Sequence, residues 1–369
     1  MIIYWLNFIE KILMYKKPGY FCKQPFTYTE VQPNFIEGKD GPLAQYLCCP
    51  NWNNTVLGTS ENLKENWNSK EAEEVRNEML KGNFKNCETS NCPSLNTFIK
   101  NGKVHSDIYP IEMFDKIVGD YSVPKVVRIA NDFACNLQCP SCRLEFIPNS
   151  KQNTENINKL FNNIEKYFSN GIETISVSGA GDPFYSNPIR EFLFNFNEKK
   201  YPTFKRLSIV TNGIMFTPKS WEKMKNIRKY ISDIEVSIDA AKKDTYENKV
   251  RLRGNWDTLI KNLNFLSSLD EVPRINLSFV VQKDNYREME DFVKLGCEIF
   301  KKHKRKEKLF IKFYRIVDWA TNKEHGYNSK NICDVNHPEY RNFELEANKL
   351  TKYVKQNFVL LNFNDHTDG

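Results

Sequence analysis

The feature that most constrains this chain is a loop with three closely spaced cysteines. Cys135, Cys139 and Cys142 lie in the sequence CNLQCPSC, which follows an apolar run that includes Val127. The run predicts a buried strand that ends where the loop begins. Pro140 prevents a regular helix between the last two cysteines, so the three sulfurs can converge on one metal centre instead of forming a disulfide. Three thiolates leave one iron of a cluster open, whereas a structural metal site is closed.

A zinc knuckle is the alternative interpretation of this loop. Such a site needs a fourth ligand close by. His105 lies far upstream, and no histidine follows the loop before His303. We therefore interpret the three cysteines as cluster ligands.

The loop resembles the CxxxCxxC loop of the radical SAM superfamily, matched by Cys135, Cys139 and Cys142. The resemblance implies a [4Fe-4S] cluster whose open iron binds S-adenosylmethionine (SAM) through its amino and carboxylate groups. It also implies that one electron cleaves SAM to methionine and a 5′-deoxyadenosyl radical, which abstracts a hydrogen atom from the substrate. Ser141 is a small departure, because many members carry an aromatic residue just before the third cysteine.

A second group of cysteines lies upstream of the loop. It comprises Cys22, the adjacent pair Cys48 and Cys49, and then Cys87 and Cys92. Neighbouring residues of a strand point to opposite faces, so only one cysteine of the pair is expected to bind the same centre as the others. We predict Cys22, Cys48, Cys87 and Cys92 as ligands, with Cys49 as the competitor of Cys48. Four thiolates also suit a structural zinc ion, and this alternative stays open.

This upstream segment is similar to the SPASM and twitch auxiliary-cluster modules. The similarity rests on Cys22 with Pro25-Phe26, the Cys48-Cys49 pair, the helix junction ENWNS at 65–69 and the closing cysteines. It implies a second, auxiliary [4Fe-4S] cluster. The segment departs from the pattern because it precedes the radical loop and its closing cysteines are wider apart than CxxC. In addition, the glycine usually found close before the second cysteine is displaced to Gly38 or Gly41.

The remainder of the chain predicts the fold. Apolar strands alternate with amphipathic helices, which is typical of βα units with parallel strands. The predicted strands are Lys125 to Asn131, Glu173 to Ser178, Arg206 to Val210, Ile234 to Ala240, Ile275 to Val281 and Leu309 to Ile316. Six units do not make the eight of a closed barrel. We predict an α/β fold, a partial (β/α)6 TIM-type barrel with a small N-terminal cysteine-rich module.

The predicted domains follow from these patterns. They are an N-terminal extension (1–19), the SPASM/twitch-like auxiliary-cluster module (20–100), the radical SAM partial barrel (121–318) and a C-terminal helical cap (319–369). The cap contains one helix with an apolar stripe through Phe343, Ala347, Leu350 and Val354. Ser69 is predicted to cap a helix that Gly82 ends.

SAM contacts are predicted at the carboxyl ends of the strands, where the active face of such a barrel lies. The segment SGAGDP at 178–183 matches the superfamily's GGEP segment, which engages the SAM amino group, with aspartate in place of glutamate. Glycine there permits close approach by a ligand. By resemblance, the segments after the third and fourth strands lie near the SAM ribose and carboxylate. The predicted contacts are Gly179, Ala180, Gly181, Asp182, Thr211, Asn212, Ser237 and Asp239.

Substrate-binding groups are less defined by the sequence. On the last strand, Lys312, Tyr314 and Ile316 alternate with Phe313 and Arg315, and either set can face the interior. Polar residues that face the interior are expected to bind substrate. The residues that act directly in catalysis are not identified.

Composition limits the compartment and the partners. The ten cysteines cluster in metal-like spacings, which favours a reducing, cytoplasmic setting. A mean hydropathy of -0.60 and the absence of a long apolar run exclude a transmembrane helix, so no membrane partner is expected. The net charge is +7, and its one dense run, at 301–308, is interpreted as a solvated helix end rather than a nucleic-acid site. The stretch 1–14 lacks the flanks of a signal peptide; it is either an amphipathic helix or precedes a start at Met14.

We therefore predict a radical SAM enzyme that acts on a peptide or protein. The resemblance implies a reductant partner such as flavodoxin or ferredoxin. A carbohydrate or aminosugar dehydrogenase or epimerase of the same superfamily is the alternative. A non-catalytic iron-sulfur or zinc protein is the alternative from another class, and it predicts no deoxyadenosine on reduction. A nucleic-acid-modifying role is favoured only by the mild basicity.

Overall fold

The structure is a computed structural model. It describes residues 16–33, 43–88, 92–101, 107–143, 145–177, 180–303, 309–317, 326–356 and 358–363. The predictions for residues 1–15, Gly38, Gly41, His105, Gly179 and the basic run beyond His303 lie outside the described residues.

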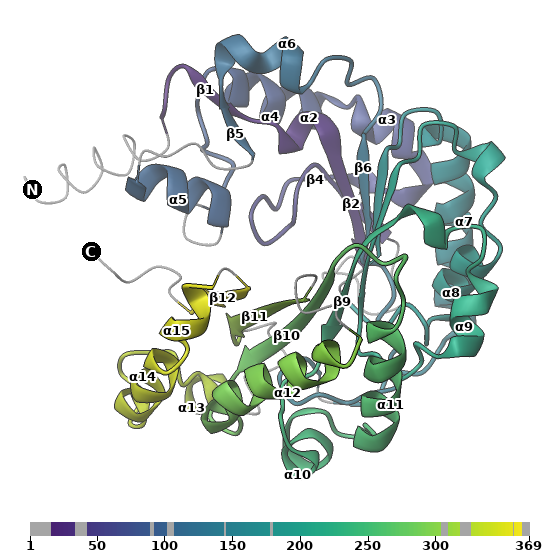
Figure 1. The fold of residues 1–369 in the computed structure, drawn as a ribbon. Coiled ribbons are helices and arrows are strands. Elements are labelled where there is room, and N and C mark those ends of the chain that lie inside the picture. The colour runs from purple at the N-terminus through teal and green to yellow at the C-terminus, as the bar shows by residue number, and fades with distance from the viewer. Residues whose placement is uncertain are drawn as a thin grey trace, which may run out of the picture.

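A ten-stranded sheet curves through the molecule in the order β12-β11-β10-β9-β8-β7-β6-β2-β3-β4. Neighbouring strands from β12 to β2 are parallel, and β2, β3 and β4 are antiparallel. Helices cover the outer face, and the inner face is turned to the centre of the curve (Figure 1). Among the described strands, β12 and β4 stand at the two ends, so the sheet is open. The predicted α/β class with an open, partial barrel is confirmed.

All six predicted barrel strands are present. They are β6 (Val126–Ile129), β7 (Thr174–Val177), β8 (Arg206–Thr211), β9 (Ile231–Ser237), β10 (Ile275–Val281) and β11 (Leu309–Arg315). Alternate residues, such as Val127, Ile175 and Leu207, are buried in one large core with the helices. The residues between them therefore point to the inner face.

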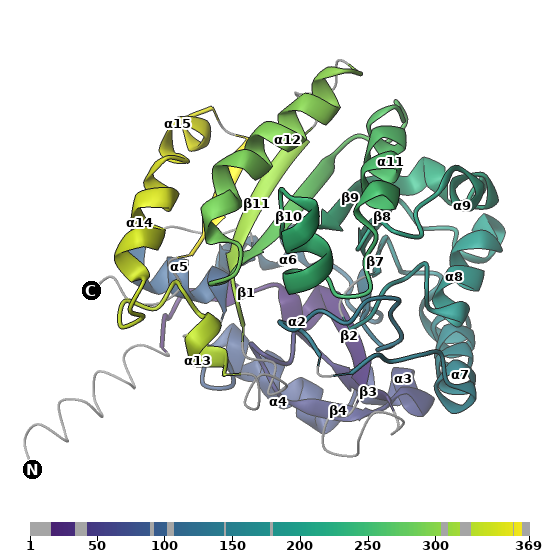
Figure 2. The ribbon, with the colours of Figure 1, turned by 90° about the horizontal axis from the view of Figure 1, so that it is seen from below.

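The main outer helices follow the strands in sequence (Figure 2). They are α7 (Lys151–Phe168), α8 (Asn187–Phe194), α9 (Pro218–Lys223), α11 (Trp256–Ser267) and α12 (Met289–Lys301). α7 begins where the Ser150 side chain accepts the Asn153 N–H, and α11 begins where Asn255 accepts the Thr258 N–H. These caps satisfy N–H groups that have no partner within the helix. Short turns connect the units: η3 (Glu198–Lys200), η4 (Arg228–Tyr230), α10 (Lys243–Thr245), η5 (Tyr246–Val250) and η6 (Tyr286–Glu288).

The predicted N-terminal module contributes three strands to the central sheet, which the sequence did not indicate. They are β2 (Tyr28–Pro33), β3 (Leu43–Tyr46) and β4 (Val56–Thr59), and β2 pairs in parallel with β6. Beside them lie β1 (Tyr20–Cys22), paired with β5 (Ile108–Pro110), and the helices α2 (Gln24–Thr27), α3 (Leu63–Trp67), α4 (Lys70–Leu80), α5 (Pro93–Asn101) and α6 (Phe114–Ile117), with η1 (Ser60–Asn62) and η2 (Ile111–Met113). Ser69 caps α4 as predicted, and Gly82 follows that helix with a φ of 67°.

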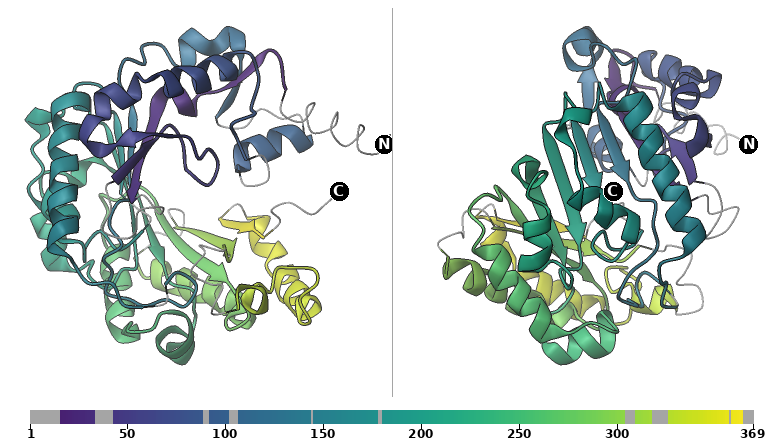
Figure 3. Two further views of the ribbon diagram at one scale, coloured as in Figure 1. Left: turned by 180° about the vertical axis from the view of Figure 1, so that it is seen from behind. Right: turned by 90° about the vertical axis from the view of Figure 1, so that its right-hand side faces the viewer.

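The C-terminal tail also departs from its prediction. The single predicted helix is divided into α14 (Tyr340–Asn348) and α15 (Thr351–Val354), after the short α13 (Tyr327–Lys330). The tail ends in β12 (Val359–Asn362), which extends the sheet beside β11. The N-terminal module and the tail thus stand at opposite ends of the curved sheet (Figure 3). Within the described residues, no helix has both the length and the apolar composition needed to cross a membrane.

Candidate metal centre and cofactor site

The loop that leaves β6 holds the three predicted cluster ligands together. Cys135 and Cys139 are buried, Cys142 is partly exposed, and all three pack with Leu137 and Ile214. The N–H of Cys142 donates to the carbonyl of Cys139 at 2.9 Å, which closes a tight turn at the proline. The loop lies at the carboxyl end of the parallel strands, as the sequence predicted.

Hydrogen-bond donors surround the three sulfur atoms. The donors are Arg251 Nη1 to Cys139 Sγ (3.3 Å), Arg143 Nη2 to Cys142 Sγ (3.5 Å), the Leu137 N–H to Cys135 Sγ (3.4 Å) and Asn212 Nδ2 to Cys135 Sγ (3.7 Å). Two guanidinium groups and polar N–H groups compensate the negative charge that thiolate ligands carry. This environment fits a metal-bound set of cysteines.

Burial shifts the pKa of the two buried thiols of the loop. Burial raises the pKa of Cys135 to about 12 and also raises the pKa of Cys139, although Arg251 opposes the latter shift. Metal binding would have to displace these protons, because the thiolate is the ligand. Among the described residues, no three Cys, His, Asp or Glu side chains could hold a single metal ion. The ligands of a cluster bind different iron atoms, so they are spaced more widely than those of one ion.

Asp182 joins the turn after β7 to the end of β8. Its side chain is 1% exposed, and burial raises the pKa of its carboxyl. Oδ1 accepts the N–H groups of Phe184 (3.0 Å) and Tyr185 (3.2 Å), and Oδ2 accepts the Thr211 hydroxyl and the Asn212 N–H, both at 2.8 Å. Both oxygens are thus used within the chain, which makes Asp182 a positioning residue. Its predicted contact with SAM stays a prediction.

The neighbouring residues of this turn pack against the cysteine loop. A Cβ atom on Gly181 would lie 2.3 Å from the Ala134 carbonyl oxygen and 2.5 Å from that of Asp132. The Ala180 carbonyl accepts a hydrogen bond from Arg143 at 2.6 Å. The close approach that Gly181 permits is therefore made by the backbone of the cysteine loop. A contact of this segment with SAM also stays a prediction.

Asn212 links the end of β8 to the cysteine loop. Its Nδ2 donates to Asn136 Oδ1 at 2.9 Å, and its Oδ1 accepts the Ile214 N–H at 3.0 Å. Gly213 follows with a φ of 79°, a conformation that favours glycine. The structure thus brings Thr211 and Asn212 beside the predicted metal centre.

Asp239 and Arg251 form a buried ion pair next to the same centre. Arg251 Nη2 lies 2.8 Å from Asp239 Oδ2, and Asp239 Oδ1 accepts the Val280 N–H at 2.7 Å. Burial raises the pKa of Asp239, and Arg251 opposes that shift. Since Arg251 also donates to Cys139, it connects Asp239 to the metal centre. Ser237 lies two residues before Asp239, on the inner face. Its hydroxyl accepts a hydrogen bond from the Ser278 hydroxyl at 3.2 Å.

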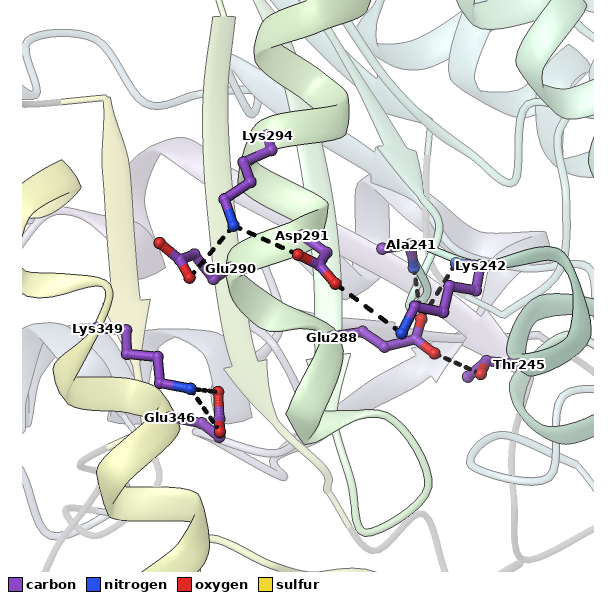
Figure 4. Close-up of polar contacts among 9 residues, drawn as sticks. All are labelled: Ala241, Lys242, Thr245, Glu288, Glu290, Asp291, Lys294, Glu346 and Lys349. Atoms are coloured by element: carbon purple, nitrogen blue, oxygen red, sulfur yellow. Dashed lines mark hydrogen bonds and ion pairs between the residues drawn. The ribbon is translucent and has the colours of Figure 1, made fainter.

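A buried glutamate fixes the loop that follows Asp239 (Figure 4). Glu288 is 7% exposed and accepts hydrogen bonds from the Ala241 N–H (2.8 Å), the Lys242 N–H (3.1 Å) and the Thr245 hydroxyl (2.5 Å). These bonds hold the start of the turn that leads through η5 to Arg251.

Sequence reasoning missed Arg143, Arg251 and Glu288. Arg143 directly follows the third cysteine, so its position was a usable signal. Arg251 and Glu288 reach the site through loops and share no spacing with the motifs, so the sequence alone carried no signal for them.

The four predicted N-terminal ligands also lie close together. Burial is the largest cause that raises the pKa of the Cys48 thiol, and Cys22, Cys87 and Cys92 raise it further. Such an electrostatic effect requires short distances. Cys22, Cys87 and Cys92 pack against the small N-terminal core. Cys22, Cys87 and Cys92 thus lie near enough to Cys48 to affect its thiol, and their role as ligands of one centre stays a prediction.

Cys49 faces a different environment from Cys48. Burial raises its pKa to about 11, and the next causes are the Glu30 carboxylate and the Arg128 guanidinium. Both of these side chains belong to the inner face of the sheet. This arrangement favours Cys48 as the ligand, and the assignment stays a prediction.

Comparisons with known proteins agree with the family resemblance that the cysteine loop indicated. Residues 133–296 match the model of the Radical SAM superfamily. The antilisterial bacteriocin subtilosin biosynthesis protein AlbA of Bacillus subtilis (strain 168) is 25% identical over 170 residues. These residues are 45% of this chain and 36% of AlbA, so the chain spans little more than a third of that relative.

Two solved structures were also found to be similar. TYW1 with a lysine-pyruvate adduct bound has 18% sequence identity and a TM-score of 0.40, with 72% of this chain and 82% of that chain covered. The histidine-tagged protein anSMEcpe with bound AdoMet has 17% identity and a TM-score of 0.39, with 64% of this chain and 62% of that chain covered.

The matched region includes the predicted cluster-binding loop and most of the barrel strands. It begins two residues before Cys135 and includes all three loop cysteines, strands β7 to β10 and the Asp239–Arg251 pair. Residues 133–296 are therefore similar to the domain that defines the radical SAM superfamily of enzymes, and the match covers a little less than half of the chain.

Proposed function

We propose that this chain is a radical SAM enzyme that cleaves SAM reductively and abstracts a hydrogen atom from a peptide or protein substrate. The observation that carries the proposal is the loop of Cys135, Cys139 and Cys142, which lies at the carboxyl end of the sheet inside the matched domain. These residues would hold a [4Fe-4S] cluster. When bound, the cluster supplies the electron that cleaves SAM, and the resulting 5′-deoxyadenosyl radical takes a hydrogen atom from the substrate.

The residues around the loop stabilise the thiolates that would bind the cluster. Arg143 and Arg251 place positive charge next to Cys142 and Cys139, which stabilises the thiolate forms. Asp239 fixes the position of Arg251 through their buried ion pair. The fixed orientation of these groups is the protein's contribution to the reactivity of the site.

SAM would bind along the neighbouring strand ends. Ala180, Thr211 and Ser237 follow or end β7, β8 and β9, which are adjacent in the sheet and adjacent to the loop. Asp182 connects the end of β7 to the end of β8, because it accepts the Asn212 N–H. Asn212 in turn connects β8 to the cysteine loop, because it donates to Asn136. The arrangement supports a continuous cofactor site across the three strands.

The N-terminal cysteines would hold an auxiliary [4Fe-4S] cluster. The convergence of Cys22, Cys48, Cys87 and Cys92 supports this, since four thiolates close such a cluster. Zinc is the alternative, because it accepts the same ligands. Metal analysis of the purified chain distinguishes the two, since an auxiliary cluster adds about four irons to the four of the radical cluster, whereas zinc adds none.

A peptide or protein substrate is supported by the similarity to AlbA, whose name assigns it to the biosynthesis of a bacteriocin. A flavodoxin or ferredoxin would deliver the electron.

Deoxyadenosine formation tests the proposal. The chain is reconstituted anaerobically with iron and sulfide, reduced with dithionite in the presence of SAM, and analysed by liquid chromatography and mass spectrometry. The native chain and Cys297→Ala, which removes a packed thiol on α12, are expected to form 5′-deoxyadenosine. The triple variant Cys135→Ala/Cys139→Ala/Cys142→Ala is expected to form none. No product from the native chain would favour the non-catalytic metal protein.

A further inference from the structure

The inner face of the sheet carries an arginine on the strand that leads into the cysteine loop. Val127 and Ile129 of β6 are buried in the outer core, so Arg128 between them points inward. Its partner in register on β2 is Glu30, which is 1% exposed. The Cys49 thiol lies close to both side chains and to Cys92. Arg128 is therefore near the N-terminal cysteines while its own strand continues into the radical loop.

Glu30 does not satisfy this arginine. Its Oε2 accepts the Tyr28 hydroxyl at 2.5 Å, and its Oε1 accepts the Gln32 side-chain amide. Arg128 Nε lies 3.8 Å from Oε1, which is too far for a hydrogen bond. Glu30 balances the charge of Arg128, but the hydrogen bonds that Glu30 accepts come from Tyr28 and Gln32.

The guanidinium of Arg128 is consequently short of acceptors. An arginine has five N–H donors. The Arg128 Nε–H is buried and has no hydrogen-bond partner, the Tyr28 hydroxyl that donates to Glu30 is an acceptor near the guanidinium, and one-third of the Arg128 side chain is exposed. By contrast Lys312, which also points inward, lies 2.7 Å from the Glu235 carboxylate. A buried charged donor without a partner costs free energy unless a ligand completes it.

We propose that Arg128 binds a carboxylate of the substrate inside the barrel, and that the substrate is an acidic peptide segment. A carboxylate presents two acceptor oxygens in one plane, which match the arginine fork. The net charge of +7 also favours an acidic partner. The inference rests on the proposed function, because it names the substrate of the same site.

A selection from a random peptide display library tests this inference. The full chain, reconstituted with iron and sulfide and loaded with SAM, is compared with Arg128→Gln, Arg128→Lys and Arg206→Gln. Arg206 is an exposed arginine at the start of β8, so its substitution removes the same charge elsewhere. Aspartate or glutamate should be enriched about tenfold or more at one position by the native chain and by Arg206→Gln. The enrichment should disappear in Arg128→Gln and fall in Arg128→Lys, which keeps the charge but not the fork.

Folding is controlled by a second variant. Arg128→Gln leaves Glu30 buried without its counter-charge, whereas Glu30→Gln/Arg128→Gln removes both charges. The double variant should melt like the native chain and still lose the acidic preference.

Three results would overturn the inference. They are no acidic enrichment by a native chain that forms deoxyadenosine, an enrichment retained in Arg128→Gln, and a tenfold or greater loss of SAM affinity in Arg128→Gln. The last result would assign Arg128 to the carboxylate of SAM instead of the substrate. A native chain that forms no deoxyadenosine would instead refute the proposed function.

Discussion

The Asp182→Asn substitution tests how the strand ends at which SAM is proposed to bind are held together. The variant keeps the size of the side chain but replaces one acceptor oxygen by an NH₂ group. If that group takes the place of Oδ2, it faces the Thr211 hydroxyl and the Asn212 N–H, both now 2.8 Å from the oxygen. The hydroxyl can rotate and accept, but the backbone N–H cannot.

The expected cost follows from these bonds. A hydrogen bond to a charged group contributes about 1.5–3 kcal/mol, and a buried donor left without a partner costs about 1–3 kcal/mol. Removal of the buried charge returns part of the desolvation cost that raises the pKa of Asp182. We therefore expect the free energy of unfolding at neutral pH to fall by about 2–4 kcal/mol.

Urea denaturation of the metal-free chain, followed by tryptophan fluorescence, measures this change. Asp233→Asn is the matched control, because Asp233 is only partly buried and accepts two hydroxyls, from Ser208 at 2.8 Å and Ser232 at 2.7 Å. Both hydroxyls can rotate, so the control should lose less than about 1 kcal/mol. Equal losses in the two variants would refute the positioning role of Asp182.

Four further substitutions test other parts of the site. Cys48→Ala should remove the iron of the N-terminal site and Cys49→Ala should retain it, as measured by iron analysis; the opposite result would exchange their roles. Arg251→Gln removes a donor to Cys139, so the reduction potential of the radical cluster should become more negative in an EPR-monitored titration, and an unchanged potential would speak against the contact. Gly181→Ala places a Cβ 2.3 Å from a backbone oxygen, which should lower stability by about 1–3 kcal/mol or more in thermal melts; a native-like melting curve would contradict this packing.

Local patterns were sufficient to predict the barrel. Each of the six strands is an apolar run of its own, and the outward residues such as Val127 and Ile175 could be recognised from alternation alone. The same reasoning placed the cysteine loop at the end of β6 because the loop directly follows that strand.

Long-range pairing was not accessible in this way. The parallel register of β2 with β6 joins Tyr28 to Val126, and β12 is a short strand whose exposed Leu360 gives no clear alternation. The positions of β2 and β12 depend on which edges of the folded barrel sheet are available for pairing, and no local sequence pattern predicts this.

The candidate site shows the same division. Motif residues such as Asp182 and Asn212 were predicted because they match motifs of the superfamily at successive strand ends. Arg251 was not found because its contact with Cys139 is made by two loops that meet only in the folded chain. Arg128 was overlooked for a related reason, since its missing acceptors become visible only when Glu30 is seen beside it.

The most direct test of the account is the iron and sulfide content of three reconstituted chains. The first is the native chain, and the second is the triple alanine variant of Cys135, Cys139 and Cys142. The third is the quadruple alanine variant of the four predicted N-terminal ligands, Cys22, Cys48, Cys87 and Cys92. Two [4Fe-4S] sites predict about eight irons in the native chain and about four in each variant, with deoxyadenosine formation lost in the triple variant. An iron content that does not fall in the triple variant, with SAM cleavage retained, would contradict the central claim that this loop holds the reactive cluster.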